Sequence, residues 1–335
     1  MLFCGQAEDL LQGDIMIKMG FARFLFGFTA GVFAILGAEK PIPASWTVEN
    51  DLISLQLAYS SDGVFGPVSI TDKKSSRVWQ HTQDSVHGPV QMNNWLHGQT
   101  KYRQPAYGTV AIANGIRHTF SLKPKYFDGT VVFNVEVYQG LPFVRTNFSY
   151  QNEGDQKILI RNSDVLNWGF REGGGDQAVD FAAFHVKQWK HPDVNFEIAE
   201  TPLTSGSVAE LLSGAHGNDC SWIAIRDKRT NNGLAAGWEF NGQARGEVKH
   251  SRYRELLSLR TSTDVNQYLE PGAKIDFPRS FIGVFNGDWD EAGYCTQRFV
   301  EKILAKPIPD KNKFPYLMFD SWGYGQDINE KTLRQ

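Results

Sequence analysis

The sequence lacks the signatures of nucleic-acid, nucleotide and metal-binding proteins. Lys and Arg number 34 against 37 Asp and Glu, the formal net charge is −3, and no run of basic residues occurs. We therefore expect no nucleic-acid partner, because such binding needs a basic footprint. The eight His form no HxH or HExxH pair, and no Cys/His cluster has zinc spacing. A P-loop, a G-x-S-x-G elbow and a strand-linked G-x-G-x-x-G are also missing.

Cysteine is scarce, with three residues in the whole chain. Cys4 lies ahead of the first apolar run, which leaves Cys220 and Cys295. One disulfide between these two and a pair of free thiols are both compatible with the sequence.

Long hydrophobic runs are also rare. Residues 24–36 form an uncharged apolar run of 13 residues, preceded by Lys18 and Arg23 and followed by small residues up to Ala38. This pattern predicts a secretory signal peptide cleaved near Ala38, and hence a secreted or periplasmic protein without stable membrane insertion after cleavage. The alternative is an uncleaved anchor, although a membrane-spanning helix needs about 20 apolar residues.

The first fifteen residues do not fit a signal peptide, because they carry acid where a basic region is typical. The acidic residues are Glu8, Asp9 and Asp14. We expect translation to begin at Met16 or Met19, with residues 1–15 as an upstream extension.

Aromatic residues and glycine are abundant, with 23 Phe, 11 Tyr, 9 Trp and 32 Gly. Period-two alternation predicts strands with one buried face. It is clearest at Ile53, Leu55, Leu57 and Tyr59, and again at Val131, Phe133, Val135 and Val137. Turn signals separate such runs at Asn114-Gly115, Asp128-Gly129, Gly140, Asn232-Gly233 and Pro271-Gly272. Residues 46–285 therefore predict a mainly β fold, a large antiparallel β-sandwich of about a dozen or more short strands.

The pattern changes after residue 287. Asp288 is placed to cap a helix, with Glu291 at the third helical position. Apolar residues then recur at spacings of three and four, which predicts one buried helix face. They are Ala292, Cys295, Phe299, Val300, Ile303 and Leu304. A proline-bounded polar linker follows up to residue 315.

The last twenty residues begin a new unit. Residues 316–319 form a short apolar run typical of a strand buried on both faces, and a helix-like stretch starts at residue 329. The predicted organisation is an upstream extension and signal peptide, a β-sandwich domain, a linker helix with its linker, and the start of a further domain. Their ranges are 1–38, 39–287, 288–315 and 316–335.

Two adjoining segments resemble the junction region of the alpha-galactosidases (melibiases) of glycoside hydrolase family 36. They read PGAKIDFPRSFIGVFNGDWDEAGYCTQRFVEKIL and FPYLMFDSWGYGQDINEKTLRQ. In that family an N-terminal β-supersandwich leads through a helical linker into a (β/α)8 catalytic barrel. The match covers residues 271–335, and over residues 46–270 the resemblance is one of architecture.

The resemblance implies a cofactor-independent hydrolase that cleaves terminal α-galactosides with retention, and it allows a homo-oligomer. Retention requires two carboxylates about 5–5.5 Å apart. In the family both come from later barrel strands, beyond residue 335, so we expect no catalytic residue in this chain. We therefore expect a truncated, catalytically incomplete N-terminal portion, since a full barrel takes about 250 residues.

Trp322 and Asp320 are the candidate substrate-binding residues, and Asp320, like Phe319, is a weaker candidate than Trp322. Trp322 and Asp320 follow the predicted first barrel strand, and barrel sites lie at the C-terminal ends of strands. A Trp face stacks on a sugar ring, and a carboxylate accepts hydrogen bonds from its hydroxyls. The resemblance likewise places a substrate-contacting Trp at Trp322. The alternative is that Trp322 is a core aromatic covering the barrel mouth.

Polar and aromatic residues also gather between residues 87 and 103, in a predicted loop. They are His87, Gln91, Asn93, Asn94, Trp95, His97, Lys101, Tyr102 and Arg103. Such a loop could border a sugar site, but a hydrogen-bonded loop with one anchoring Trp is the commoner arrangement.

Three interpretations remain open. The first is a truncated alpha-galactosidase, and the second is a non-catalytic secreted carbohydrate-binding β-sandwich. The third is a related glycosidase of other specificity, such as an α-glucosidase or an N-acetylgalactosaminidase. The residues that separate the first from the third would lie in the later barrel.

Overall fold

A computed structural model describes the sandwich and the helix after it. The described residues are 44–81, 90–92, 95–96, 101–126, 128–171, 180–188, 196–204, 206–213, 219–239, 242–250 and 256–305. The predicted signal peptide, the linker after residue 305 and the predicted barrel start lie outside these ranges.

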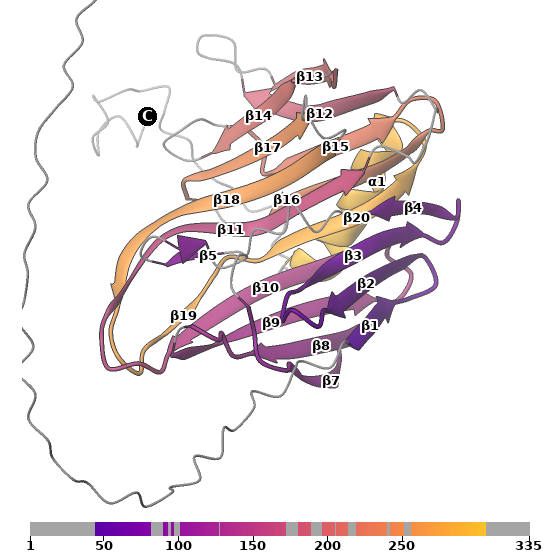
Figure 1. Ribbon diagram of the computed structural model, residues 1–335. Helices are drawn as coiled ribbons and strands as arrows, with labels where there is room; N and C mark the ends of the chain where they lie inside the picture. Colours follow the sequence, from indigo (N-terminus) through magenta and orange to yellow (C-terminus); the bar gives the residue numbers. More distant parts are fainter. Residues whose placement is uncertain are drawn as a thin grey trace, which may run out of the picture. The chain divides into compact units, whose positions relative to one another are not determined.

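Within these described residues, twenty strands form three antiparallel sheets (Figure 1). The four-stranded sheet has the order β1 (Ala44–Glu49), β2 (Ile53–Tyr59), β3 (Phe65–Asp72) and β4 (Arg77–Gln80). The six-stranded sheet has the order β14 (Val208–Ser213), β17 (Ala244–His250), β18 (Leu256–Leu269), β11 (Ile158–Arg171), β5 (Val90–Met92) and β6 (Trp95–Leu96).

The ten-stranded sheet is the largest. Its order is β13 (Phe196–Pro202), β12 (Phe181–Gln188), β15 (Trp222–Asp227), β16 (Asn232–Trp238), β20 (Ser280–Asn286), β10 (Phe143–Asn152), β9 (Gly129–Tyr138), β8 (Gly115–Leu122) and β7 (Ala106–Ile112), with β19 (Lys274–Asp276) paired to β10. Two strands differ from the short strands predicted, since β11 and β18 each run for 14 residues.

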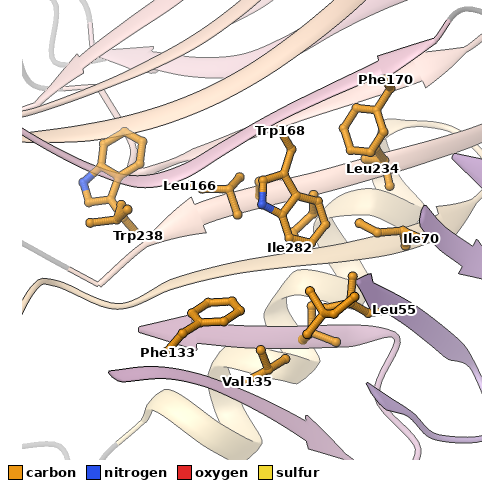
Figure 2. Packing of buried hydrophobic residues seen from close by; sticks show 14 of the residues in the cluster. Leu55, Ile70, Phe133, Val135, Leu166, Trp168, Phe170, Leu234, Trp238 and Ile282 are labelled. Atoms are coloured by element: carbon orange, nitrogen blue, oxygen red, sulfur yellow. The ribbon is translucent and has the colours of Figure 1, made fainter. Parts of the chain in front are cut away.

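The main core lies between the inner face of the ten-stranded sheet and the other two sheets. Trp46 of β1 packs edge-on against Phe120 of β8, with ring centroids 5.2 Å apart, which joins the four-stranded and ten-stranded sheets. Trp79 of β4 meets Phe170 of β11 at 5.9 Å, which joins the four-stranded and six-stranded sheets. Figure 2 shows Trp168 and Leu166 of β11 in the same interior as Phe133 of β9 and Ile282 of β20. The predicted mainly β, antiparallel sandwich is therefore confirmed.

The apolar positions predicted for β2 and β9 are buried, because Leu55, Leu57, Val135 and Val137 are at most 3% exposed. The end of β9 differs from the one buried face predicted, because Glu136 and Tyr138 on its other face are also buried. The turn at Asn114 is also as predicted, with a positive φ of 59° between β7 and β8.

Two predicted turn dipeptides have other roles. β8 and β9 do form a hairpin, but residues 123–128 connect them and Gly129 opens β9. A Cβ on Gly129 would lie 2.4 Å from Tyr150 Oη, so this glycine permits close packing rather than a tight turn. Between β15 and β16 the positive φ of 55° falls on Asn231 instead of Asn232. Gly233 belongs to β16, where a Cβ would lie 2.1 Å from Phe285 Cζ.

The helix predicted after residue 287 is α1 (Trp289–Phe299), which continues into a π-helical turn over Val300–Leu304. Asp288 caps it as predicted, because its carboxylate accepts the backbone N–H groups of Asp290 and Glu291. Ala292 and Phe299 are fully buried, but Val300 is 39% exposed and does not belong to the buried face. Val300 still follows the regular helical spacing, because its N–H bonds to the carbonyl of Thr296, and it lies at the edge of the apolar stripe. The N–H of Ala305 bonds to the carbonyl of Val300, and this wider i→i+5 turn changes the spacing only of the residues that follow.

Cys220 and Cys295 are both free thiols, which settles the open choice against a disulfide. Burial raises the pKa of both, and for Cys295 the nearby Glu291 carboxylate adds to this and brings the pKa to about 12. Neither thiol is therefore an activated nucleophile. Within the described ranges, no helix combines the length and apolar character needed to span a membrane.

Candidate functional site at the junction helix

The predicted substrate-binding residues Trp322 and Asp320, and the weaker candidate Phe319, lie outside the described residues. Their roles stay predictions.

Of the predicted loop group, the structure describes the side chains of Lys101, Tyr102 and Arg103. Tyr102 is 4% exposed, its carbonyl accepts the hydroxyl of Tyr59 at 2.9 Å, and its N–H donates to Gly63. Tyr102 thus anchors the chain in the sandwich, while Lys101 and Arg103 are exposed. The predicted loop contains the strands β5 and β6, and the anchoring role of Trp95 stays a prediction. His87 and His97 lie outside the described residues.

The functional geometry that the structure does describe lies on the outer face of the ten-stranded sheet, where α1 crosses it (Figure 1). At the start of the helix, Trp289 stacks on Phe184 of β12 with ring centroids 4.7 Å apart. At its end, Phe299 stacks on Phe143 of β10 at 4.9 Å and meets Tyr138 of β9 at 6.2 Å. The helix therefore crosses the sheet from β12 to β9.

Hydrogen bonds and one cation–π contact also hold the helix in place on the sheet. Trp289 Nε1 donates to Glu200 at 2.8 Å, and Trp222 Nε1 donates to Thr296 at 2.9 Å. Arg226 lies over the Trp289 ring, 5.6 Å from its centroid. Specific contacts thus hold the segment through which the chain leaves the sandwich.

A cluster of charged groups lies on the same outer face. Glu136 bridges two arginines, with Arg117 Nη2 at 2.6 Å and Arg145 Nη1 at 3.3 Å, and it also accepts the hydroxyl of Tyr138. Arg145 forms a bidentate pair with Glu239, with Nε to Oε1 at 2.6 Å. The cluster contains two arginines and two glutamates, so its formal charges cancel. We call these five residues the Glu136 cluster.

Electrostatics decides what the Glu136 cluster can do. Burial alone would raise the pKa of Glu136, but hydrogen bonds from Tyr138 and Arg117 and the charge of Arg145 outweigh it and lower the pKa. Burial and the adjacent Glu136 carboxylate raise the pKa of Tyr138 to about 12. A general acid needs a carboxyl group that holds its proton near neutral pH, and Glu136 does the opposite. The cluster is therefore suited to positioning the strands beside the helix rather than to proton transfer.

An open groove of about 650 Å³ lies at the end of this sheet, where the β1–β2 turn meets the β7–β8 hairpin. Asn50 holds one wall, because its Nδ2 donates to the carbonyls of Tyr138 and Leu141 at 2.5 and 2.8 Å. Asp51 accepts the N–H of Gly140 at 3.2 Å. These bonds fix the β1–β2 turn against the β9–β10 turn.

The Glu136 cluster was not among the predicted sites, although the turn at Gly140 indicates it. In a hairpin with a tight turn at Gly140 and Leu141, two residues lie opposite each other when their sequence numbers add up to 281. Arg145 therefore lies opposite Glu136, as the strand register shows. Arg117 lies opposite Glu136 on the other side, on β8. Charged cross-strand neighbours of opposite sign on three successive strands would have predicted the cluster.

The architecture is that of a β-supersandwich with a helix across its outer face. Solved structures of similar fold include the alpha-galactosidase of Lactobacillus brevis, with a TM-score of 0.60 and 10% identity over 77% of this chain and 42% of that one. The GH36 alpha-galactosidase AgaA of Geobacillus stearothermophilus gives a TM-score of 0.62 and 10% identity, over 78% of this chain and 44% of that one. A TPR-domain containing protein of Parabacteroides distasonis gives 0.51 and 9% identity, over 80% and 50%.

No protein-family model matches the sequence, and no curated protein matches it. The described part of the chain has a GH36-like fold, and the similar structures include glycosidases. The chain spans about 42–44% of the length of the first two alpha-galactosidases.

Proposed function

We propose that this chain is the N-terminal portion of a secreted glycoside hydrolase of the alpha-galactosidase kind, which cleaves terminal α-galactosides with retention. One observation carries the proposal: the supersandwich fold that 77–78% of this chain shares with alpha-galactosidases, of whose own chains the match covers 42–44%. Variants of AgaA have been solved in complexes with raffinose and stachyose, which supports a galactoside as the substrate class.

In this proposal Trp322 stacks on the sugar ring and Asp320 accepts a hydrogen bond from a sugar hydroxyl. The nucleophile and the acid/base come from barrel strands encoded after residue 335. The lowered pKa of Glu136 agrees with this division, because a carboxyl group with a lowered pKa is poorly suited to act as the acid. The sandwich then serves to hold the junction helix, and catalysis belongs to the barrel.

The test is to resequence the locus past the codon of Gln335 and to assay both products on a chromogenic α-galactoside. We expect the 335-residue chain to be inactive and the longer product to release the α-anomer first, as followed by NMR. In the longer product, Trp322→Ala should lower kcat/KM roughly tenfold, equivalent to about 1.4 kcal/mol, while Trp322→Phe should keep most of the activity.

The proposal fails if no barrel follows, or if the longer product does not cleave the substrate. Retention of residues 39–305 on immobilised galactosides would then favour a carbohydrate-binding sandwich instead. Activity on an α-glucoside or an N-acetylgalactosaminide in place of the galactoside would favour the related glycosidases.

A further inference from the structure

The strand β7 has one backbone edge that no described strand covers. It is the last strand of the ten-stranded sheet, and β8 pairs with it on one side only (Figure 1). Residues 106–111 are all exposed, with Val110 at 52% and Tyr107 at 43%. The strand reads AYGTVAI, without the charged residues or the proline that commonly keep an edge strand from pairing. β7 is therefore suited to accept a further strand.

The turn between β7 and β8 decides which backbone groups point outward. Two residues, Ala113 and Asn114, connect the strands, and Ile112 lies opposite Gly115 beside the turn. The pair that flanks a two-residue turn is hydrogen-bonded, and bonded pairs alternate with non-bonded pairs along the ladder. The even-numbered residues of β7 therefore bond to β8. The N–H and C=O groups that point away from the sheet belong to the odd-numbered residues, Tyr107, Thr109 and Ala111.

Nothing in the described part of the chain requires glycine at position 108. Gly108 is not among the residues with a positive φ, and a Cβ added to it would meet no atom within 4 Å. Glycine weakens a strand, and in a strand it often marks a place where another backbone or a ligand approaches closely. The space beside Gly108 is therefore open in one chain and can receive a side chain from a second.

A second copy of β7 fits this edge when it runs antiparallel about a two-fold axis at Thr109. In this register all seven residues are paired, and Thr109 meets its own counterpart. The outward groups of the two strands then face each other, because the odd-numbered residues pair among themselves. Each remaining pair sets a larger side chain against a smaller one, which lets facing side chains interdigitate. The pairs are Tyr107 with Ala111, Val110 with Gly108, and Ile112 with Ala106.

The strand behind this edge presents no charge that would repel a second copy. Arg117 of β8 lies opposite Val110, and its guanidinium is 2.6 Å from the carboxylate of Glu136. His118 contacts the hydroxyl of Tyr107 at 2.8 Å, and burial lowers the pKa of His118, so its ring is neutral near pH 7. The edge is thus complementary to itself in charge as well as in shape.

We propose that β7 is a contact surface between two copies of this chain, which pair edge to edge about Thr109 and join their ten-stranded sheets into one. Because both copies use the same strand, the contact closes a dimer. Each copy contributes a single strand, so the dimer is reversible rather than obligate. The proposal does not rest on the proposed hydrolase function, since it concerns β7 and β8 alone.

Sedimentation velocity of the 335-residue chain, over roughly 1 to 200 μM, tests for the dimer. We expect the average mass to rise from one chain toward two. Thr109→Pro should weaken the dimer at least roughly tenfold, because proline removes an outward N–H and spares the bonds to β8. Gly108→Val should also weaken it, because it fills the space that Val110 of the second copy needs. Thr109→Val keeps the N–H and is the matched control, so it should leave the mass curve unchanged.

Cysteine substitution tests the register. The two copies of residue 109 lie opposite each other, about 5.5 Å apart between Cα atoms, which is within disulfide range. The two copies of residue 106 lie six positions apart along the ladder, or about 20 Å. With oxidised glutathione, Thr109→Cys should form a 109–109 disulfide, identified by peptide mass spectrometry, and Ala106→Cys should form no 106–106 disulfide. Circular dichroism should show that all variants fold.

A wild-type chain that stays monomeric over the whole concentration range would overturn the proposal. A dimer that is unchanged by both Thr109→Pro and Gly108→Val would overturn it too, and would assign the contact to another surface. Equal cross-linking through positions 106 and 109 would show that the two strands do not pair in this register, which also contradicts the proposal.

Discussion

The stability of the outer face depends on ion pairs made by single residues of the Glu136 cluster. Glu136 is 5% exposed and forms ion pairs with both Arg117 and Arg145. Glu136→Gln would leave these guanidinium groups without that counter-charge, and breaking a buried pair costs about 3 kcal/mol. We discount this to roughly 2 kcal/mol because Arg117 is 38% exposed. Urea unfolding followed by circular dichroism would measure the loss.

Glu210→Gln is the control for this change. Glu210 pairs with Arg245 on β17 at 3.1 Å, but both side chains are more than 40% exposed. Its loss should cost less than about 0.5 kcal/mol. Equal effects of the two substitutions would show that burial does not strengthen the Glu136 contacts.

His81 makes stability depend on pH. It is 6% exposed, and burial lowers its pKa from 6.5 to about 4, although a contact with the Gly169 carbonyl at 2.5 Å opposes the shift. Between these values the unfolded chain binds more protons than the folded one, so stability falls as pH drops from about 6.5 to 4. The full shift corresponds to roughly 3 kcal/mol.

The check is the free energy of unfolding of wild type and His81→Gln across this pH window. The difference between the two proteins should shrink as pH falls from 7 to 4, because the variant lacks the titrating imidazole. Parallel curves would mean that His81 keeps an ordinary pKa in the folded protein.

At the scale of elements, the junction helix offers a matched pair of adjacent residues. Phe299 is fully buried among the rings of Tyr138, Phe143 and Phe281, whereas Val300 is 39% exposed. Phe299→Ala should cost about 3–5 kcal/mol, and Val300→Ala less than about 1 kcal/mol. Thermal unfolding of both variants would measure this. Similar losses would contradict the helix orientation described above.

Local signals predicted most elements of the fold. The buried apolar positions of β2 and β9, the turn at Asn114 and the cap at Asp288 depend on neighbours in the chain, and all three are as predicted. Gly233 was misassigned because its role depends on Phe285, more than fifty residues away. Val300 was placed on the buried face because spacings of three and four from neighbouring apolar residues did not show that it lies at the edge of the apolar stripe, about 100° around the helix from Phe299.

The candidate site was less predictable for the same reason. Glu239 joins Arg145 across 94 positions, and the groove brings Asp51 beside the β7–β8 hairpin. Such contacts follow from strand order, and single-sequence patterns do not contain the order in which ten strands pair. The roles of Trp322 and Asp320 stay predictions.

At the scale of the whole molecule, one sheet serves two cores. The inner face of the ten-stranded sheet packs against the other two sheets, and its outer face packs under the junction helix. Glycines on the outer face make room for the rings beneath the helix. A Cβ on Gly283 would lie 2.3 Å from Phe143 Cδ1, and one on Gly237 would lie 2.5 Å from Phe281 Cζ. The sheet surface is therefore shaped for a cover, and the helix is part of the folded unit.

This arrangement predicts at which residue the chain can be truncated without loss of a stable sandwich. A protein ending at residue 287, the predicted boundary of the sandwich domain, would expose Phe143, Phe281 and Phe285, which are at most 4% exposed beneath the helix. We expect it to bind the dye ANS and to self-associate, because fully buried aromatic side chains each cover roughly 150–250 Å². A protein ending at residue 305 keeps the helix, so it should stay monodisperse in light scattering and bind little dye. Equal dye binding and equal light scattering of the two proteins would show that the sandwich is stable without the helix and that the stable unit ends at residue 287.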